Sequence, residues 1–168
     1  KQIDILINNA GINLVGPISD LKVVDFERVQ KVNVTAPFML CQTVLPQMRE
    51  RKWGRIVNIS SIWGKISKAH RAPYSASKFA IDGLTAAISA EVAVDGVLVN
   101  SVAPGCIETK LTRSVLGVEG MNKLALQVPV QRVGTPEEIA LFIAWLAGPE
   151  NTYISGQNIA SDGGFTRV

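Results

Sequence analysis

The sequence predicts an α/β fold in which helices cover both faces of a parallel sheet, giving three layers. Two observations carry this prediction. Short, β-branched apolar runs alternate along the chain with longer segments whose apolar residues recur every three or four positions. Polar or glycine-containing clusters stand directly after these runs. Alternating strands and helices indicate right-handed crossover connections, which build parallel sheets with ligand sites at the carboxyl ends of the strands.

Size and composition indicate one globular domain over residues 1–168. The chain has 47% hydrophobic and 18% charged residues, enough to bury a core and unlike a disordered chain. No repeat, low-complexity tract or linker divides it. The net charge of +3 is spread along the sequence without a basic cluster, so we expect no nucleic-acid partner.

The sequence also bears on compartment and metal content. No apolar run reaches the length of a membrane span and no secretory signal opens the chain, so a cytoplasmic protein without a membrane partner is expected. Cys41 and Cys106 stand far apart among apolar or small residues, which favours two thiols over a disulfide. No His, Cys and Asp cluster has ligand spacing, so no metal is expected.

The first part of the chain predicts strand, helix, helix, strand. Residues 3–7 are a β-branched apolar run typical of a buried strand. Ser19 is the expected N-cap of a helix through Val29, and residues 38–51 form a second helical stretch. Residues 55–59 predict the second strand.

The middle of the chain predicts a packed helix and a third strand. The helix begins near Pro73 and carries small and apolar residues at three-and-four spacing, and Gly96 ends it. Residues 97–102 predict the strand, and a long loop is expected after Pro104.

The last part of the chain predicts one helix and one strand. Thr135 and Glu138 form a capping box, with Pro136 at the first helical position, for a helix through Leu146. Residues 157–160 predict the final strand.

Tyr74 and Lys78 are a candidate catalytic pair. They are four residues apart near the start of a predicted helix, so both side chains project from one face. A neighbouring ammonium favours the phenolate and lowers the pKa of a tyrosine from about 10. Such a tyrosine can exchange a proton with a hydroxyl or carbonyl oxygen. On spacing alone, the pair is more often an exposed helix face without function.

Three polar clusters follow successive predicted strands. They are Asn8-Asn9-Ala10-Gly11, Ser60-Ser61 and Pro104-Gly105. Each alone is typical of a turn, but their shared position favours one site at the carboxyl edge of the sheet. Ser61 stands thirteen positions before Tyr74, and a hydroxyl there can hold the oxygen that Tyr74 protonates.

Together these segments resemble the short-chain dehydrogenase/reductase family. The resemblance rests on Asn8-Asn9-Ala10-Gly11, Lys31-Val32-Asn33-Val34, Ser60-Ser61, Tyr74-Ser75-Ala76-Ser77-Lys78, Asn100-Ser101-Val102-Ala103-Pro104-Gly105, Ser155-Gly156-Gln157 and Asp162-Gly163-Gly164. Within the family the sequence is most similar to 3-oxoacyl-acyl-carrier-protein reductases and related alcohol or sugar dehydrogenases. The resemblance implies the C-terminal portion of a Rossmann-like domain, namely the family's strands four to seven with their helices.

The resemblance implies an NAD(P)-dependent oxidoreductase that interconverts a carbonyl and a secondary alcohol. Its substrate would be a small molecule, with an acyl-carrier-linked 3-oxoacyl thioester as a candidate. Tyr74 would act as general acid in reduction and general base in oxidation, and Ser61 would polarise the carbonyl. Lys78 would lower the pKa of Tyr74 and bind the nicotinamide ribose. Asn33 would hold a water of the proton relay.

The resemblance also implies where NADP or NAD would bind, with NADP slightly favoured. Asn9, Ala10 and Gly11 would lie along the adenosine half. The residues expected around the nicotinamide half are Tyr74, Lys78, Pro104, Gly105, Ile107 and Thr109.

The sequence departs from the family pattern at its start. The glycine-rich phosphate turn of the family does not occur, and Gly117-Val118-Glu119-Gly120 has the wrong context. We therefore expect an N-terminally truncated chain without the glycine-rich βαβ region, in which residues 3–7 form an exposed sheet edge. The alternative is a catalytically inactive α/β fragment that acts only as an associating module.

Basic residues border the expected substrate mouth. The segment from Trp63 to Arg71 includes Lys65, Lys68 and His70. Lys110 and Arg113 follow Thr109. We interpret these residues as a solvated rim, with an anionic substrate or carrier as the sharper alternative.

Two apolar helical segments, residues 38–48 and 79–88, have more apolar surface than a sheet alone would cover. In the family the corresponding helices form a dimer interface, so the resemblance implies a homodimer or homotetramer.

Overall fold

The parallel sheet expected from the sequence is present. The computed structural model describes residues 2–168, with side chains for all of them except 110, 111 and 114–116. The four strands are β1 (Ile5–Asn8), β2 (Gly54–Ile59), β3 (Val97–Pro104) and β4 (Asn158–Ser161). They pair in this order, and every pair is parallel.

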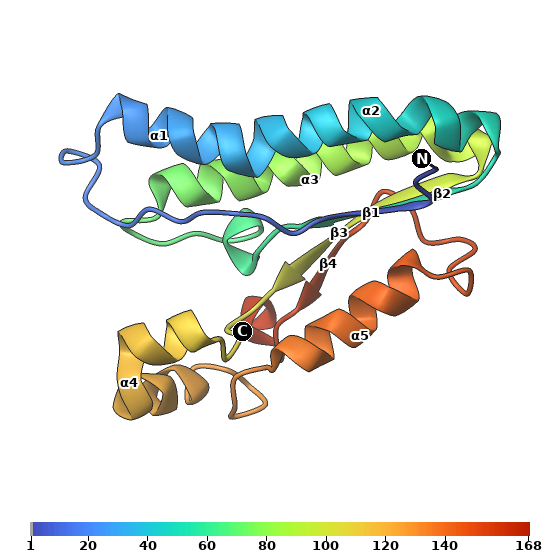
Figure 1. Cartoon of the computed structure of the whole chain (residues 1–168). Coiled ribbons are helices and arrows are strands. Elements are labelled where there is room, and N and C mark those ends of the chain that lie inside the picture. Colours follow the sequence, from blue (N-terminus) through green and yellow to red (C-terminus); the bar gives the residue numbers. More distant parts are fainter. Residues whose placement is uncertain (1) are drawn as a thin grey trace.

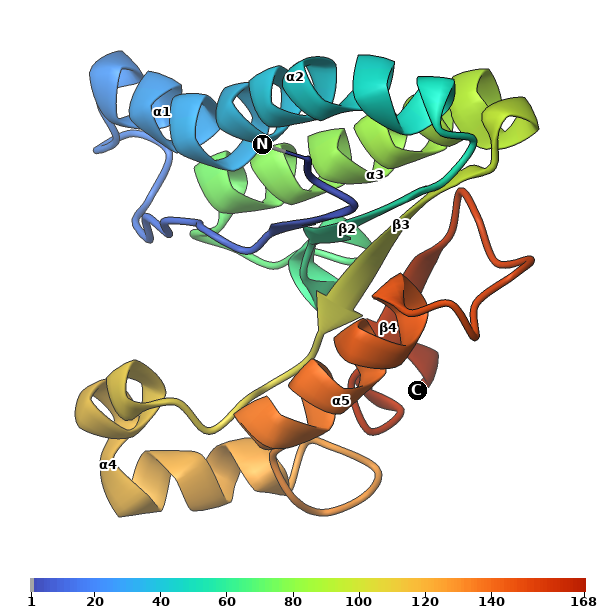
Figure 2. The same ribbon diagram turned by 45° about the vertical axis from the view of Figure 1, so that its right-hand side comes forward.

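Helices cover both faces of the sheet, as predicted (Figure 1). One layer holds α1 (Val23–Gln30), α2 (Ala36–Glu50) and α3 (Ala72–Val92). The other holds α5 (Pro136–Ala147), with α4 (Lys110–Ala125) beyond its beginning. Figure 2 shows the two layers on opposite sides of the strands.

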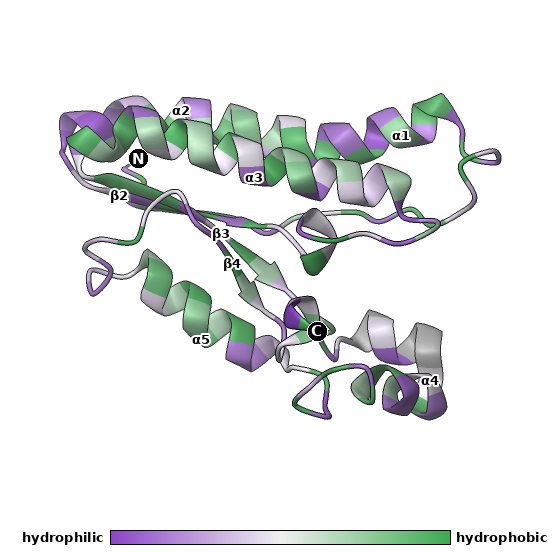
Figure 3. Cartoon of the chain, turned by 180° about the vertical axis from the view of Figure 1, so that it is seen from behind, coloured by the Kyte–Doolittle hydropathy of each residue, from purple (hydrophilic) through white to green (hydrophobic). Residues whose placement is uncertain are grey.

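Each face of the sheet has its own hydrophobic core. Successive residues of a strand point to opposite faces, so Ile56 packs toward α2 and α3 while Val57 packs toward α5. Figure 3 shows apolar residues concentrated along the strands and on α5. Cys41 belongs to the first core, and neither Cys41 nor Cys106 is in a disulfide. None of the helices in the described part of the chain is both long and apolar enough to span a membrane.

The first two predicted helices form one rod. A π-helical turn, η1 (Lys31–Thr35), joins α1 directly to α2. The predicted N-cap is wrong, because the helix begins at Val23 and the Ser19 hydroxyl instead bonds the Asp20 carboxylate at 2.7 Å. The rod places Asn33 in the π-helical turn, a feature frequent at functional sites.

The expectation of a long loop after Pro104 is wrong, because α4 occupies part of this segment. Thr109 caps this helix by accepting a hydrogen bond from the backbone N–H of Thr112 at 3.0 Å. The helix is interrupted at Gly117, whose φ is 62°. This kink shortens each regular stretch, so the apolar periodicity stays weak.

The capping box of α5 is confirmed. The Thr135 hydroxyl accepts from the Glu138 N–H at 3.3 Å, and the Glu138 carboxylate accepts from the Thr135 N–H at 2.9 Å. Arg132 pairs with Glu138 at 2.6 Å. The hydrogen bond from Arg132, followed by that from Thr135, lowers the pKa of Glu138 to about 2.

Replacing Thr135 with Ala is expected to lower the free energy of unfolding by about 1 kcal/mol, because the first turn of α5 loses its cap. Urea denaturation measures the change. Thr43→Ala is the matched control, since the Thr43 hydroxyl bonds Met39 inside α2 and caps nothing. Equal losses in the two variants would contradict a capping role.

β1 is an open edge, as expected. It pairs only with β2 among the described residues. Ile5 and Ile7 are 44% and 45% exposed, whereas Leu6 between them packs on the core beneath α2. One face of β1 is therefore covered and the other is open.

Candidate active site

The carboxyl edge of the sheet brings the four predicted catalytic residues together. Ser61 directly follows β2 and precedes the 3-10 turn η2 (Ile62–Gly64). Tyr74 and Lys78 lie in the first two turns of α3, which packs against η1, η2 and β3. Asn33 comes from η1. Three segments separate in sequence therefore meet at one place.

The Lys78 side chain is buried away from solvent. Its side chain is 4% exposed, and Nζ donates to the carbonyl oxygen of Ile59 at 2.7 Å. Nζ lies 5.5 Å from the centroid of the Tyr74 ring. Burial lowers the pKa of Lys78 to about 8. An ammonium has three donors, so this side chain can bind further oxygen atoms.

The pKa of Tyr74 differs from the value expected from the sequence, which was a lowered one. Burial raises its pKa, while the hydrogen bond with Ser61 and the charge of Arg71 act in the opposite direction. Lys78 is not among the groups that act on this pKa here, so its expected lowering effect stays a prediction. Loss of hydration on burial of the Tyr74 hydroxyl outweighs these favourable neighbours.

Asn33 ties the segment after β1 to α3. Its Oδ1 accepts from the Ile12 N–H at 2.8 Å, and its Nδ2 donates to Ile12 O at 2.9 Å and Ser77 Oγ at 3.0 Å. The side chain is 2% exposed. Its amide is thus engaged in positioning the chain, and the predicted water-holding role stays a prediction.

Gly11 keeps the approach to Lys78 open. A Cβ at this position would lie 3.4 Å from Asn33 Oδ1 and 3.6 Å from Lys78 Nζ. Any larger side chain would occupy the space in front of the ammonium. Asn9 and Ala10 are exposed at the end of β1, on the approach to the same site.

A groove of about 550 Å³ runs between the strand ends and α5. Four expected cofactor contacts line it, namely Asn9, Pro104, Ile107 and Thr109. Sequence reasoning missed the opposite wall, formed by Pro136, Ile139, Ala140, Ile143 and Ala144 of α5. The capping box predicted that helix, but nothing in the sequence indicated that it faces the strand ends. A mainly apolar groove beside a lysine with free donors fits the nicotinamide–ribose half of a dinucleotide.

Gly105 serves a different purpose from the other expected contacts. A Cβ there would lie 2.7 Å from Asp162 Cα, and the Gly105 N–H donates to Ser161 O at 3.0 Å. Glycine at this position lets the end of β3 pack against the turn after β4.

The basic residues do not form one rim. Arg113 pairs with Glu108, and Lys65 lies in a hollow beside Asn158 and Arg167 at the β4 edge. The side chain of Lys110 lies outside the described residues. Lys68 and Arg71 are both directed at the Trp63 ring, at 5.0 Å and 5.9 Å from its centroid.

The buried Lys78 predicts a pH dependence of stability. Because its folded-state pKa of about 8 is below the ordinary 10.5, the unfolded chain binds more protons between these values, and stability rises with pH there. Below pH 8 both states are protonated and this contribution is lost. The free energy of unfolding should therefore rise relative to that of Lys78→Met from about pH 8 to pH 10, as measured in urea. Parallel pH profiles would contradict the assignment.

Comparisons with known proteins agree with this geometry. Residues 1–166 match the family model described as enoyl-(acyl carrier protein) reductase. The chain is 40% identical over 166 residues to the 3-oxoacyl-[acyl-carrier-protein] reductase of Vibrio cholerae, covering 99% of this chain and 68% of that protein.

Two solved structures are similar as well. A gluconate 5-dehydrogenase of Burkholderia cenocepacia, in complex with NADP and tartrate, is 33% identical with a TM-score of 0.93, covering 99% of this chain and 66% of that one. A 4-hydroxyisoleucine dehydrogenase complexed with NADH is 36% identical with a TM-score of 0.93, covering 98% and 69%. The chain spans about two thirds of the length of the relatives it matches.

Proposed function

The chain belongs to the short-chain dehydrogenase/reductase family, and we propose that it is the catalytic part of an NAD(P)-dependent oxidoreductase that interconverts a carbonyl group and a secondary alcohol. One observation carries the proposal. Tyr74, Lys78 and Ser61 lie together at the carboxyl edge of a parallel sheet, with Lys78 and Ser61 buried, beside an apolar groove. Residues 1–168 would form a single domain, the C-terminal part of the family's nucleotide-binding domain.

In the reducing direction Tyr74 is the general acid. Its raised pKa keeps the hydroxyl protonated at rest, so a proton is available for the substrate oxygen. The Ser61 hydroxyl accepts from the Trp63 N–H at 3.2 Å, which leaves its own proton free to donate to that oxygen. In the oxidising direction the same groups act in reverse.

Lys78 supports this proton transfer electrostatically. When Tyr74 gives up its proton, the resulting phenolate has an ammonium 5.5 Å from its ring in a poorly hydrated site. A relay water at Asn33 would bind its main chain, because both groups of the side-chain amide are already bonded.

The residues around the groove fit a nicotinamide cofactor. Lys78 has donors for ribose hydroxyls, Gly11 leaves them accessible, and Ile107 and Pro104 offer an apolar wall. Thr109 lies at the same wall, while Asn9, Ala10 and Gly105 would complete the contacts. The cofactor supplies the hydride in reduction and accepts it in oxidation when bound. NADPH is favoured over NADH only by resemblance.

The similarity to a 3-oxoacyl-[acyl-carrier-protein] reductase favours a 3-oxoacyl thioester as the substrate. A second copy of the chain is the proposed partner, forming a homodimer or homotetramer through α2 and α3. Phe38, Met39, Leu40 and Phe79 are 47–58% exposed on these helices. A monomeric mass in light scattering would count against this assembly.

The alternative is an inactive fragment that associates through its open β1 edge. Calorimetric titration of the chain with NADPH and then NADH separates the two. Saturable binding that is lost in Gly11→Val, whose side chain fills the space before Lys78, supports the oxidoreductase. No binding of either nucleotide supports the fragment.

A further inference from the structure

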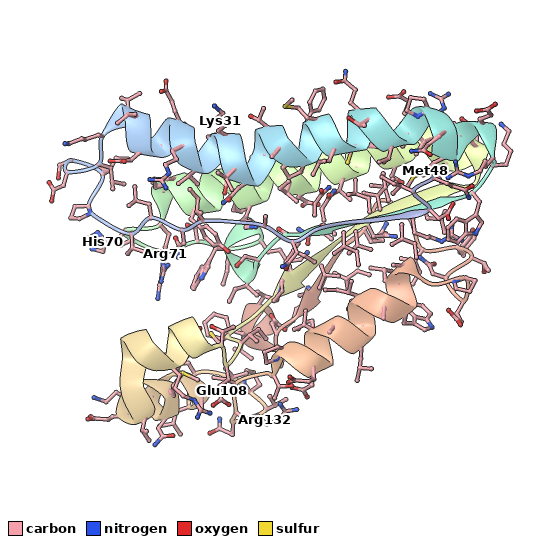
Figure 4. The ribbon with its side chains drawn as sticks, in the orientation of Figure 1. Lys31, Met48, His70, Arg71, Glu108 and Arg132 are labelled. Atoms are coloured by element: carbon pink, nitrogen blue, oxygen red, sulfur yellow. The ribbon has the colours of Figure 1, made fainter. Side chains whose placement is uncertain are left out.

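The loop between η2 and α3 carries two cations over one aromatic ring. Lys68 Nζ lies 5.0 Å from the centroid of Trp63, and the guanidinium carbon of Arg71 lies 5.9 Å from it. Figure 4 shows Arg71 extending from the loop toward the side of α4, with His70 at the outer end of the loop. Both cations are thus gathered at one place beside the catalytic pocket.

The loop is fixed at both ends. Ser67 Oγ and Ser75 Oγ lie 2.8 Å apart, and the Gly16 N–H donates to His70 O at 3.2 Å. These bonds tie the loop to α3 and to the segment after β1. Lys68 and Arg71 therefore extend from an ordered backbone.

The C-terminal turn packs against the Trp63 ring. Phe165 packs edge-on against Trp63, with ring centroids 6.2 Å apart at 79°. Asp162 holds this turn closed, because its Oδ2 accepts from Thr166 N at 2.8 Å and Thr166 Oγ1 at 2.7 Å. The C-terminal turn therefore supports the Trp63 ring beside which the two cations lie.

Neither cation has an anionic partner in the described part of the protein. No ion pair there includes Lys68 or Arg71. The charge of Asp162 acts on Cys106, as the charges of Lys68 and Arg71 do. The Asp162 carboxylate, however, accepts hydrogen bonds from the backbone of its own turn. The Nε of Arg71 is buried and lacks a hydrogen-bond partner among the described residues. Buried donors are normally bonded, so this arrangement calls for an acceptor.

The place for that acceptor is next to the reacting group. Arg71 is three residues before Tyr74, and its charge lowers the pKa of Tyr74 against the larger effect of burial. The charges of both Lys68 and Arg71 also reach the Cys106 thiol, beside the groove residue Ile107. An anion bound here would be part of the substrate, close to its carbonyl group.

We infer that Arg71 and Lys68 bind the carboxylate of the substrate, and that the substrate is a small oxo or hydroxy acid; this rests on the proposed function. Arg forms paired hydrogen bonds with a carboxylate, and Lys adds a point charge. The phosphate of an acyl carrier is separated from the thioester carbonyl by the whole pantetheine arm. A phosphate so far from the carbonyl would not reach Arg71, which is three residues from the general acid Tyr74.

The inference is tested with acetoacetate and its uncharged methyl ester. Arg71→Gln is expected to raise KM for acetoacetate, at saturating NADPH or NADH, by about 10- to 100-fold, because a charge-assisted hydrogen bond is lost. Lys68→Gln should act in the same direction with a smaller change. KM for the methyl ester should stay the same in both variants.

Lys65→Gln is the matched control. It makes the same charge change in the same loop, but Lys65 lies at the β4 edge beside Asn158. It should change neither KM. Equal KM values of the wild type for acid and ester, or equal effects of Arg71→Gln on both, would overturn the inference.

Direct binding separates this inference from the proposed function. Calorimetric titration of the wild type and of Arg71→Gln with acetoacetate requires no turnover. Binding that is lost in the variant supports the carboxylate site even if no reaction is observed, in which case the proposed function alone fails. Absence of binding in the wild type, or binding unaffected by Arg71→Gln, overturns the inference. Inorganic phosphate binding more tightly than acetoacetate would also overturn it, in favour of a phosphate-bearing substrate.

Discussion

Replacing Tyr74 with Phe is expected to lower kcat by about 10²- to 10⁴-fold, the range for losing a positioned general acid. The substitution keeps the ring that packs 5.5 Å from Lys78 and removes only the hydroxyl that bonds Ser61. Cofactor affinity should therefore change little. Steady-state kinetics gives kcat, and calorimetric titration with the nucleotide gives the affinity.

Tyr153→Phe is the control for this substitution. Tyr153 is the second of the two tyrosines in the chain and is 94% exposed, so the same chemical change there should leave kcat unaltered. A similar kcat in the two variants would remove Tyr74 from the chemistry. Loss of nucleotide binding in Tyr74→Phe would instead assign the residue to the binding site.

The strands and α5 could be predicted because their signals are local. The run at β2 is β-branched and apolar, and the capping box at Thr135 and Glu138 requires only residues three apart. The predicted N-cap at Ser19 failed because α1 begins four residues later, at Val23, with no side-chain cap. In α4 the non-helical backbone at Gly117 hides the periodicity on which the prediction depends.

That the candidate catalytic residues lie close together could be predicted, because parallel strands end at a common edge. Asn8 to Gly11 and Ser61 follow neighbouring strands, so sequence order alone places them together. The hydration of these side chains could not be predicted in the same way, because it depends on every group packed around them. The raised pKa of Tyr74 and the lowered pKa of Lys78 both come from burial, which residue spacing does not reveal.

Gly64 illustrates a site residue that only the structure reveals. A Cβ there would lie 2.7 Å from the carbonyl carbon and oxygen of Lys78 and 2.8 Å from Ser60 Oγ. Two of these atoms belong to the backbone of α3, which moves less readily than a flexible side chain. The Ser60 hydroxyl also donates to Lys78 O at 3.2 Å, so the same contact includes the hydrogen bond that joins β2 to this turn.

Gly64→Ala is therefore expected to destabilise the protein and to disturb catalysis together. Overpacking costs about 1–3 kcal/mol of unfolding free energy, and displacement of the Lys78 turn by about 1 Å lowers kcat/KM by about 100-fold. Urea denaturation and steady-state kinetics measure the two effects.

Gly83→Ala, in the helix α3 that carries Lys78, has the opposite expectation. A Cβ at Gly83 meets nothing within 4 Å, so the substitution should stabilise the helix by about 0.5–1 kcal/mol and leave the chemistry unchanged. Light scattering on both variants checks that their assembly is the same. If Gly64→Ala matched Gly83→Ala in stability and kcat/KM, close packing of η2 on α3 would not be what positions Lys78.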